Sequence, residues 1–178
     1  MTTSKNILNI NINEVKQQAQ HSVDSGALTD DYPLNVKEAC TLLNEALATE
    51  ILCVLRYRHH QMIAKGMECI EIADEFREHA ENEEQHMLMI AERINQLGGN
   101  PDFNPATILE RSVTDYGNST TLEAMIKDDL IAERIVIMVY RKMIEWFGNA
   151  DPTTRRMLED ILKDEEEHAD ELAALISK

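Results

Sequence analysis

The stretch 83-EEQHMLMIAERINQLGG-99 opens with a glutamate and a histidine three residues apart, and 165-EEEH-168 repeats this spacing further along the chain. Side chains three residues apart lie on the same face of a helix, so each pair can bind at one point. A second glutamate precedes each pair, and a tyrosine follows it after seven residues: Glu50 with Tyr57, and Glu133 with Tyr140. Four carboxylates and two imidazoles in this repeated pattern predict a two-metal site inside a four-helix bundle.

Turn and capping residues divide the chain into four long helices. Asn35 with Glu38 and Thr120 with Glu123 are typical of helix starts, as is Asp151 followed by proline, whereas Gly66, Gly98 and Gly148 are typical of helix ends. The expected helices therefore span about 35–66, 67–97, 120–148 and 151–178. Short turns make the first two antiparallel, and likewise the last two.

Residues 100–119 form an unusually long connection, with a possible helical turn at 106–111. A segment of this length can run the height of a bundle about 45 Å tall, which would make the second and third helices parallel. The expected fold is an all-α antiparallel four-helix bundle (35–178) with this long crossover. Residues 1–34 are expected to form a separate polar extension, with a possible short helix from Ile12 to Val23.

The formal charge of −16 arises from 33 acidic and 17 basic residues, and no stretch is basic enough to follow a phosphate backbone. We therefore expect no nucleic-acid partner. No apolar run is long enough for a membrane span, and the N-terminal sequence lacks the pattern of a signal peptide, so a cytoplasmic protein is expected. Cys40, Cys53 and Cys69 contain no Cys-x-x-Cys pair and are expected to be buried and reduced.

The position of each ligand suggests its role. Glu83 and Glu165 each stand beside a histidine and are placed to bridge both metals. Glu50 and His86 would complete the coordination of one ion, and Glu133 and His168 would complete the coordination of the other. Oxygen-rich shells with two imidazoles favour iron, with manganese possible. Around the ligands we expect four outer hydrogen-bonding residues, each of which has a purely structural alternative in core packing, capping or solvation: Tyr57, Tyr140, Asp129 and Asp164. His79 is either a transient ligand or a solvated histidine.

The segments LNEALATEILCVLRYRHH, EEQHMLMIAERINQLGG, DDLIAERI and DEEEHADEL resemble the four helices of the bacterioferritin family in the ferritin-like superfamily, over about residues 36–178. The similarity is greatest to its non-haem, Dps-like members. The resemblance implies a ferroxidase that oxidises Fe(II) with dioxygen or hydrogen peroxide and stores ferric mineral in a hollow homo-oligomeric shell. It carries the ligand roles over to Glu50, Glu83, His86, Glu133, Glu165 and His168, and matches Tyr57 to the family's tyrosine near the irons.

Three departures from the family pattern refine this expectation. Glu84 stands where the family has its haem-ligating methionine, so haem is not expected. The chain ends ten residues after His168, without a fifth helix, which favours a dodecamer over a shell of 24 subunits. Asn82 replaces an aspartate that is frequent in the family.

Two other classes of function remain open at this stage. The same six ligands serve di-iron or di-manganese oxygenases and catalases that act on a small substrate, which would need a pocket beside the metals. Protection of DNA by physical binding is the other class, and the acidic composition argues against it.

Overall fold

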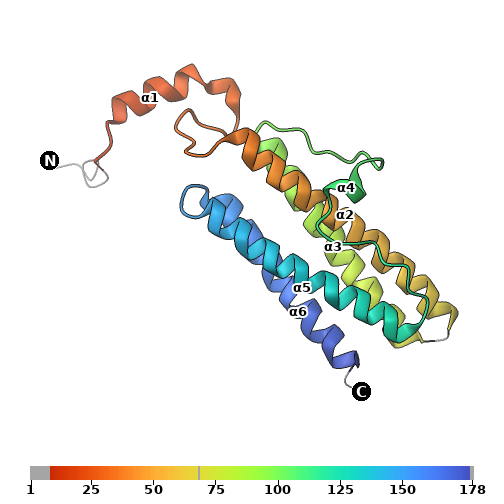
Figure 1. The fold of residues 1–178 in the computed structure, drawn as a ribbon. Helices are drawn as coiled ribbons and strands as arrows, with labels where there is room; N and C mark the ends of the chain where they lie inside the picture. The colour runs from red at the N-terminus through yellow and green to blue at the C-terminus, as the bar shows by residue number, and fades with distance from the viewer. Residues whose placement is uncertain (1–8, 68, 177–178) are drawn as a thin grey trace.

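The computed structural model describes residues 9–67 and 69–176, and all regular secondary structure in this part of the chain is helical. Its four long helices are α2 (Val36–Gly66), α3 (Ile70–Gln96), α5 (Leu122–Phe147) and α6 (Pro152–Ile176). Helix α2 packs along α3 and α5 packs along α6, and the two pairs lie side by side in Figure 1. The predicted all-α four-helix bundle is confirmed.

Two apolar clusters fill the bundle, one toward each end, and they reveal the helix directions. The first contains Leu43 and Leu47 of α2 and Ile94 of α3, while the second contains Ala64 of α2 and Ala73 of α3. Helix α2 therefore runs from the first cluster to the second, and α3 runs back. Helix α5 runs from the second cluster to the first, like α3, so the predicted parallel arrangement of these two helices is confirmed.

The connection from α3 to α5 runs along α2 and contains the short helix α4 (Ile108–Arg111), within the stretch where a helical turn was predicted. Asn44 of α2 accepts a hydrogen bond from the Asp102 backbone N–H at 2.8 Å, and its carbonyl accepts one from Arg111 at 2.8 Å. Further on, the backbone N–H of Val113 donates to the hydroxyl of Thr49 at 3.1 Å. These contacts satisfy polar groups of the long loop and hold it against the bundle.

Most of the predicted helix boundaries agree with the structure. The Asn35 side chain accepts from the backbone N–H groups of Lys37 and Glu38, which makes it the cap of α2. Gly148 ends α5 with φ of 46°, a conformation that favours glycine. The start of α5 differs by one residue: Thr121, rather than Thr120, precedes the first helical turn, and its side chain makes no capping hydrogen bond. Extended backbone at Thr121 shifts the start, because a cap needs that conformation.

The N-terminal part of the described chain has two short helices, α1 (Ile12–His21) and η2 (Val23–Ser25), at the predicted place. No residue of α1 is buried, and Figure 1 shows this helix projecting away from the bundle. The segment after it turns inward, where Leu28, Tyr32 and Leu34 pack against the first apolar cluster. Division of the chain into two units at residue 34 stays a prediction.

Asp151 links three parts of the fold at the turn between α5 and α6. Its carboxylate caps α6 by accepting from the Thr154 backbone N–H at 2.9 Å, as predicted for this residue. It also accepts from Arg93 of α3 at 3.0 and 3.1 Å, and from the Tyr32 hydroxyl at 2.8 Å. Burial alone would raise the pKa of Asp151, but hydrogen bonds from Thr154, Tyr32 and Arg93 outweigh burial and lower the pKa below its ordinary value.

We predict that Asp151→Ala lowers the free energy of unfolding by about 3 kcal/mol at neutral pH, because it leaves Arg93 without its buried partner and uncaps α6. The folded-state pKa of Asp151 is depressed, so its stabilisation is present above the ordinary pKa of 3.8 and is lost as the pH falls toward the folded-state pKa. Urea unfolding at neutral pH and near pH 3 measures both effects. The exposed Asp160→Ala is the control and should change stability little. An Asp151→Ala effect as small as the control's would contradict the prediction.

Candidate metal centre

The six predicted ligands come together at mid-height in the bundle, between the two apolar clusters. Each of the four long helices contributes, and every one of the six residues is at most 3% exposed. The contributing residues are Glu50 of α2, Glu83 and His86 of α3, Glu133 of α5, and Glu165 and His168 of α6. Four carboxylates and two imidazoles thus lie in a dry interior, where unpaired charge is costly.

These residues form two overlapping groups, each with ligand atoms within 4.8 Å of one another. One group contains Glu50 and His86, the other contains Glu133 and His168, and both contain Glu83 and Glu165. In this arrangement the two shared carboxylates lie in the middle, with one glutamate and one histidine on either side; their roles as metal ligands stay a prediction.

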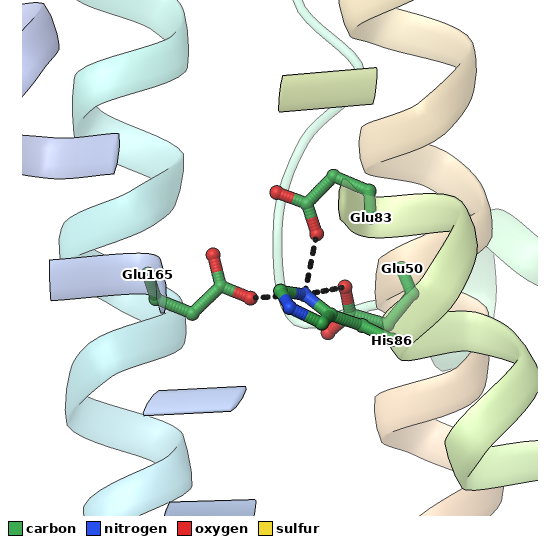
Figure 2. A group of neighbouring side chains, drawn as sticks. All are labelled: Glu50, Glu83, His86 and Glu165. Carbon is green, nitrogen blue, oxygen red and sulfur yellow. Dashed lines mark ion pairs between the residues drawn. The ribbon is translucent and has the colours of Figure 1, made fainter. Parts of the chain in front are cut away.

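Nδ1 of each histidine is the nitrogen that points into the centre. In Figure 2, His86 Nδ1 lies among three carboxylates, 3.2 Å from Glu165, 3.4 Å from Glu83 and 3.8 Å from Glu50. His168 Nδ1 lies 3.4 Å from Glu83 and 3.4 Å from Glu165. The two histidines approach different oxygens of each shared glutamate, so one oxygen of each faces each group.

The inward-facing and outward-facing atoms of the six ligands differ in whether they have hydrogen-bond partners. Eleven buried side-chain nitrogen and oxygen atoms in the described residues lack a hydrogen-bond partner, and eight of them belong to the six candidate ligands. They are one oxygen each of Glu50 and Glu133, both oxygens of Glu83 and Glu165, and Nδ1 of His86 and His168. Buried polar atoms are rarely left without partners, and these eight are the donor atoms that two cations would take.

The outward-facing atoms of the same residues do have partners. Tyr57 of α2 donates its hydroxyl hydrogen to Glu133 of α5, and Tyr140 of α5 donates to Glu50 of α2. Each tyrosine therefore serves the glutamate of the neighbouring helix rather than the one in its own helix. This reciprocal pair fixes the outer oxygens of both terminal glutamates and ties α2 to α5.

Nε2 of each histidine is oriented from outside by one polar side chain. Asp164 lies 3.3 Å from Nε2 of His86, and Asn82 lies 3.2 Å from Nε2 of His168. When Nδ1 holds a metal, Nε2 carries the proton and donates it outward. Asp164 can accept that hydrogen directly, whereas the atom of Asn82 that faces Nε2 of His168 is the amide nitrogen Nδ2, which is itself a donor. Asn82 thus occupies the position equivalent to Asp164 around the other histidine.

Asp129, the remaining predicted outer residue, makes its contacts elsewhere. One carboxylate oxygen accepts from Arg56 at 2.8 Å, and the other lies 2.8 Å from Nδ1 of His60. All three side chains are buried, and Arg56 also donates to the Asp115 carbonyl of the crossover at 3.0 Å. Asp129 therefore joins α2, α5 and the crossover beside Tyr57 and makes no hydrogen bond to the six ligands. Neither Arg56 nor His60 was predicted to take part, although their four-residue spacing places them on one helix face.

The comparisons with known proteins agree with this geometry. A family model described as a ferritin-like domain matches residues 40–178. The chain belongs to the ferritin-like domain family. It is also similar to bacterioferritins; the bacterioferritin of Mycobacterium leprae, for example, is 29% identical over 74% of this chain and 79% of its own.

Other relatives differ in the functions that their names state. A nutrient stress-induced DNA-binding protein of Synechococcus sp. is 28% identical over 79% of this chain and 81% of its own. Among solved structures, the bacterioferritin-related protein of Bacteroides fragilis, described as a dodecameric thioferritin, superposes with a TM-score of 0.77 at 28% identity and covers 93% of both chains. The Mycobacterium tuberculosis bacterioferritin BfrA has a TM-score of 0.70 at 27% identity, covering 79% of this chain and 84% of its own.

Mutual repulsion and burial shift the pKa values within this ferritin-like centre. Burial and the neighbouring carboxylates raise the pKa of Glu50 and of Glu133. Burial alone would also raise the pKa of Glu83, but its contacts with Glu50 and the two histidines lower it. For His168, burial alone would lower the pKa, yet the Glu165 and Glu83 carboxylates raise it to about 11. Without metal, protons on the imidazoles and on the outer glutamates therefore offset part of the negative charge.

Other predictions from the sequence have mixed outcomes. His79 is 2% exposed and stacks on the ring of His168, so it is not a solvated histidine. Cys40 and Cys53 are buried as expected, whereas Cys69 is partly exposed because it lies in the turn just before α3. None of the helices in the described part of the chain has the length and apolar character that crossing a bilayer requires.

We predict that Co(II), added at about 100 times its dissociation constant, raises the free energy of unfolding by about 2.7 kcal/mol for each metal bound only in the folded state. Glu50→Gln/Glu133→Gln should lose most of this increase, because each metal loses an anionic ligand. In chelator, the same variant should be at least as stable as the unchanged protein, since a neutral amide removes the cost of burying or protonating these two carboxyl groups. The control is Glu45→Gln/Glu145→Gln, which neutralises exposed acids on the same two helices. Equal metal-dependent stabilisation in both variants would contradict the prediction.

Proposed function

We propose that the protein is a ferroxidase that takes up Fe(II) as its substrate, oxidises it to Fe(III), and thereby stores and detoxifies iron. The observation that carries the proposal is the set of eight unpartnered donor atoms, arranged as two groups around the shared carboxylates of Glu83 and Glu165. Two divalent ions bring a charge of about +4 against about −4 from four glutamates, so occupancy would relieve the electrostatic cost of burying them. Membership of the ferritin-like domain family and similarity to bacterioferritins support the same conclusion.

The reaction balances with two iron ions per turnover. Each Fe(II) loses one electron, and dioxygen with two protons becomes hydrogen peroxide. With hydrogen peroxide as the oxidant, the same two electrons and two protons yield two water molecules. A pair of adjacent metal positions therefore matches the two-electron demand of either oxidant.

The residues of the centre contribute binding, orientation and a favourable electric field. Glu83 and Glu165 would hold both ions, while Glu50 with His86 and Glu133 with His168 would each hold one. Oxidation adds one positive charge at each ion, and four carboxylates in a dry interior stabilise that added charge more strongly than they would in water. Tyr57 and Tyr140 fix the outer glutamate oxygens, so the ligands reorganise little as the charge changes. Manganese is compatible with the same donor set.

A small, mainly apolar cavity of about 40 Å³ is lined in part by Ala46, Val136 and Tyr140; it contacts the centre only through Tyr140, the donor to Glu50, and contains none of the six candidate ligands. Its volume suits a water-sized molecule such as dioxygen and is too small for an organic substrate. Wider hollows at Asn35 and Trp146, and at Thr114 and Asp128, contain none of the six candidate ligands. The cavity size thus favours the ferroxidase over the alternative of an oxygenase acting on an organic molecule. It does not separate the ferroxidase from a catalase, whose substrate is equally small.

Nucleic acid is not part of the proposed function, although two relatives, from Synechococcus sp. and Nostoc sp., are named DNA-binding proteins. The net charge of −16 opposes the approach of a phosphate backbone. Haem is likewise not expected, because the exposed residue at position 84 is a glutamate, which is a poor axial haem ligand.

We predict that Glu83→Ala/His86→Ala abolishes rapid Fe(II) oxidation, with a loss greater than the roughly 10–100-fold caused by removing an outer partner of a ligand. The measurement is the appearance of Fe(III) absorbance after Fe(II), bound without oxygen, is exposed to air. Glu84→Ala/Gln85→Ala, which alters two exposed side chains in the same turn of α3, is the matched control and should oxidise at the unchanged rate. Rapid oxidation by the double ligand variant would place the chemistry elsewhere.

We also predict that the protein assembles as a cage of twelve copies, supported by the likeness to the Bacteroides fragilis protein along nearly the whole chain. Twelve copies of a 20.3 kDa chain give about 244 kDa, and light scattering on the metal-free protein measures this mass. A monomer would remove the storage part of the proposal, and a mass twice as large would indicate 24 subunits.

A further inference from the structure

Helix α1 buries none of its residues, although it carries an apolar stripe. Ile12, Val15 and Ala19 follow one another at spacings of three and four residues, so they lie on one side of the helix, and the other seven positions are polar or charged. The side chain of Val15 is 45% exposed. A helix of ten residues is marginally stable alone in water, because forming its first turn costs more backbone entropy than the hydrogen bonds return. The stripe therefore indicates a surface against which α1 packs.

The chain between α1 and the bundle directs α1 away from its own bundle. Leu28 and Leu34 pack against the first apolar cluster, and Tyr32 donates its hydroxyl hydrogen to Asp151 at 2.8 Å. Before these contacts, Gly26 adopts φ of 64°, a conformation that favours glycine and turns the chain. Figure 1 shows the result, with α1 projecting from the end of the bundle. Its apolar stripe is therefore presented to another molecule.

A groove of about 550 Å³ lies on the bundle between the start of α2 and the end of α5, which is the end from which α1 projects. Leu42 and Trp146 supply its apolar lining. Trp146 is the only tryptophan of the chain and is 37% exposed. Tryptophan is enriched among the residues that dominate the energetics of protein interfaces, so this groove has the character of a docking surface for an apolar helix face.

The charge distribution favours a second copy of this chain as the molecule that receives α1. Residues 1–23 contain one acidic and two basic residues and carry a net charge of +1, so the rest of the chain carries −17. A nearly neutral segment can approach an acidic bundle that repels the other parts of a second copy. At the groove, Lys37 and Glu38 provide one charge of each sign, and α1 offers the complementary pair Glu14 and Lys16.

The same numbers argue against a nucleic acid or a lipid surface as the partner of α1. Binding to a phosphate backbone or to anionic headgroups needs several lysines or arginines close together. Residues 1–23 supply a net charge of only +1, and the acidic bundle would be held close to the same phosphates. Neither surface matches this charge balance, whereas the groove of another copy does.

We propose that α1 docks its apolar stripe into the groove at Leu42 and Trp146 of a second copy of this chain. Each copy carries both the helix and the groove, so each gives and receives one contact, as closed assemblies of identical subunits require. A single ten-residue helix offers less surface than the roughly 800 Å² per partner of a stable interface, so the contact reinforces a larger one. The matched ferritin-like domain begins at residue 40, so α1 lies outside it. The proposal needs two copies and does not rest on ferroxidase activity.

Disulfide cross-linking of the full-length protein tests the contact. A Cys69→Ser background removes the partly exposed thiol, and Val15→Cys/Thr41→Cys then places one thiol in the stripe and one at the groove. Mild oxidation should join chains of different copies, which run as dimers or longer products on a denaturing gel without reductant. Gln17→Cys/Thr41→Cys, with its first thiol on the polar side of α1, is the matched control and should give roughly tenfold less product.

The gel also distinguishes the other surfaces that α1 could occupy. A disulfide within one chain, which consumes both engineered thiols and leaves protein of monomer size, would show that α1 folds onto its own bundle and would overturn the proposal. An absence of joined chains would overturn it too, because α1 would then pack on a different molecule or on none. Equal yields from the two cysteine pairs would show random collision rather than docking.

Acidic substitutions in the stripe test what the contact contributes to assembly. Val15→Asp/Ala19→Asp should raise the protein concentration at which copies dissociate by roughly tenfold, because docking would bury two unpaired charges. Asn13→Asp/Gln17→Asp adds the same charge on the polar side of α1 and should leave dissociation unchanged. Light scattering over a dilution series in moderate urea measures the mass of each variant. The same dissociation concentration in the two variants, or a monomeric unchanged protein, would refute the docking of α1, whatever the rate of Fe(II) oxidation.

Discussion

Repulsion among four buried carboxylates is the constraint on which the centre of this bundle depends. Glu50, Glu83, Glu133 and Glu165 lie between two apolar clusters with almost no contact with solvent. Such charges are tolerated only when protons, hydrogen bonds or cations offset them. The surrounding carboxylates raise the pKa of both histidines, which favours protons on the imidazoles, and the tyrosines donate hydrogen bonds to the outer oxygens. The inward atoms remain unpartnered, so the fold keeps an unmet electrostatic demand that the two proposed cations would meet.

The same constraint explains the concentration of hydrogen bonds around α2. Tyr57 and Tyr140 tie α2 to α5 at the centre, and Asp129 reinforces that contact through Arg56. Arg56 reaches the crossover as well, so the loop that makes α3 and α5 parallel is fastened close to the buried charges. A centre whose ligands come from four different helices needs this bracing, because small movements between the helix pairs would separate the donor atoms.

Much of the fold and the ligand set follows from spacing within single helices. Glu83 with His86 and Glu165 with His168 share a face because of helical geometry alone, and glycines and caps delimit the helices. Contacts between helices do not follow from such spacing. The sequence predicts that each tyrosine lies on the same helix face as the glutamate seven residues before it. In the structure, each tyrosine hydroxyl instead donates to the glutamate of the neighbouring helix. Asp129 lies one turn from Glu133, but its carboxylate pairs with the buried Arg56, which is seventy-three residues away in the sequence. These pairings depend on helix rotation and side-chain reach, which only the packed bundle determines.

The two halves of the centre are alike in ligands and different in surroundings. His86 is oriented by the carboxylate of Asp164, which makes the imidazole a more basic ligand, whereas His168 is oriented by the neutral amide of Asn82. His168 is also the ring on which His79 stacks. The half whose histidine faces the amide of Asn82 is therefore also the half in contact with the buried ring of His79. The two metal positions proposed for the centre would therefore differ in the basicity of their histidine ligands, although their carboxylate ligands are equivalent.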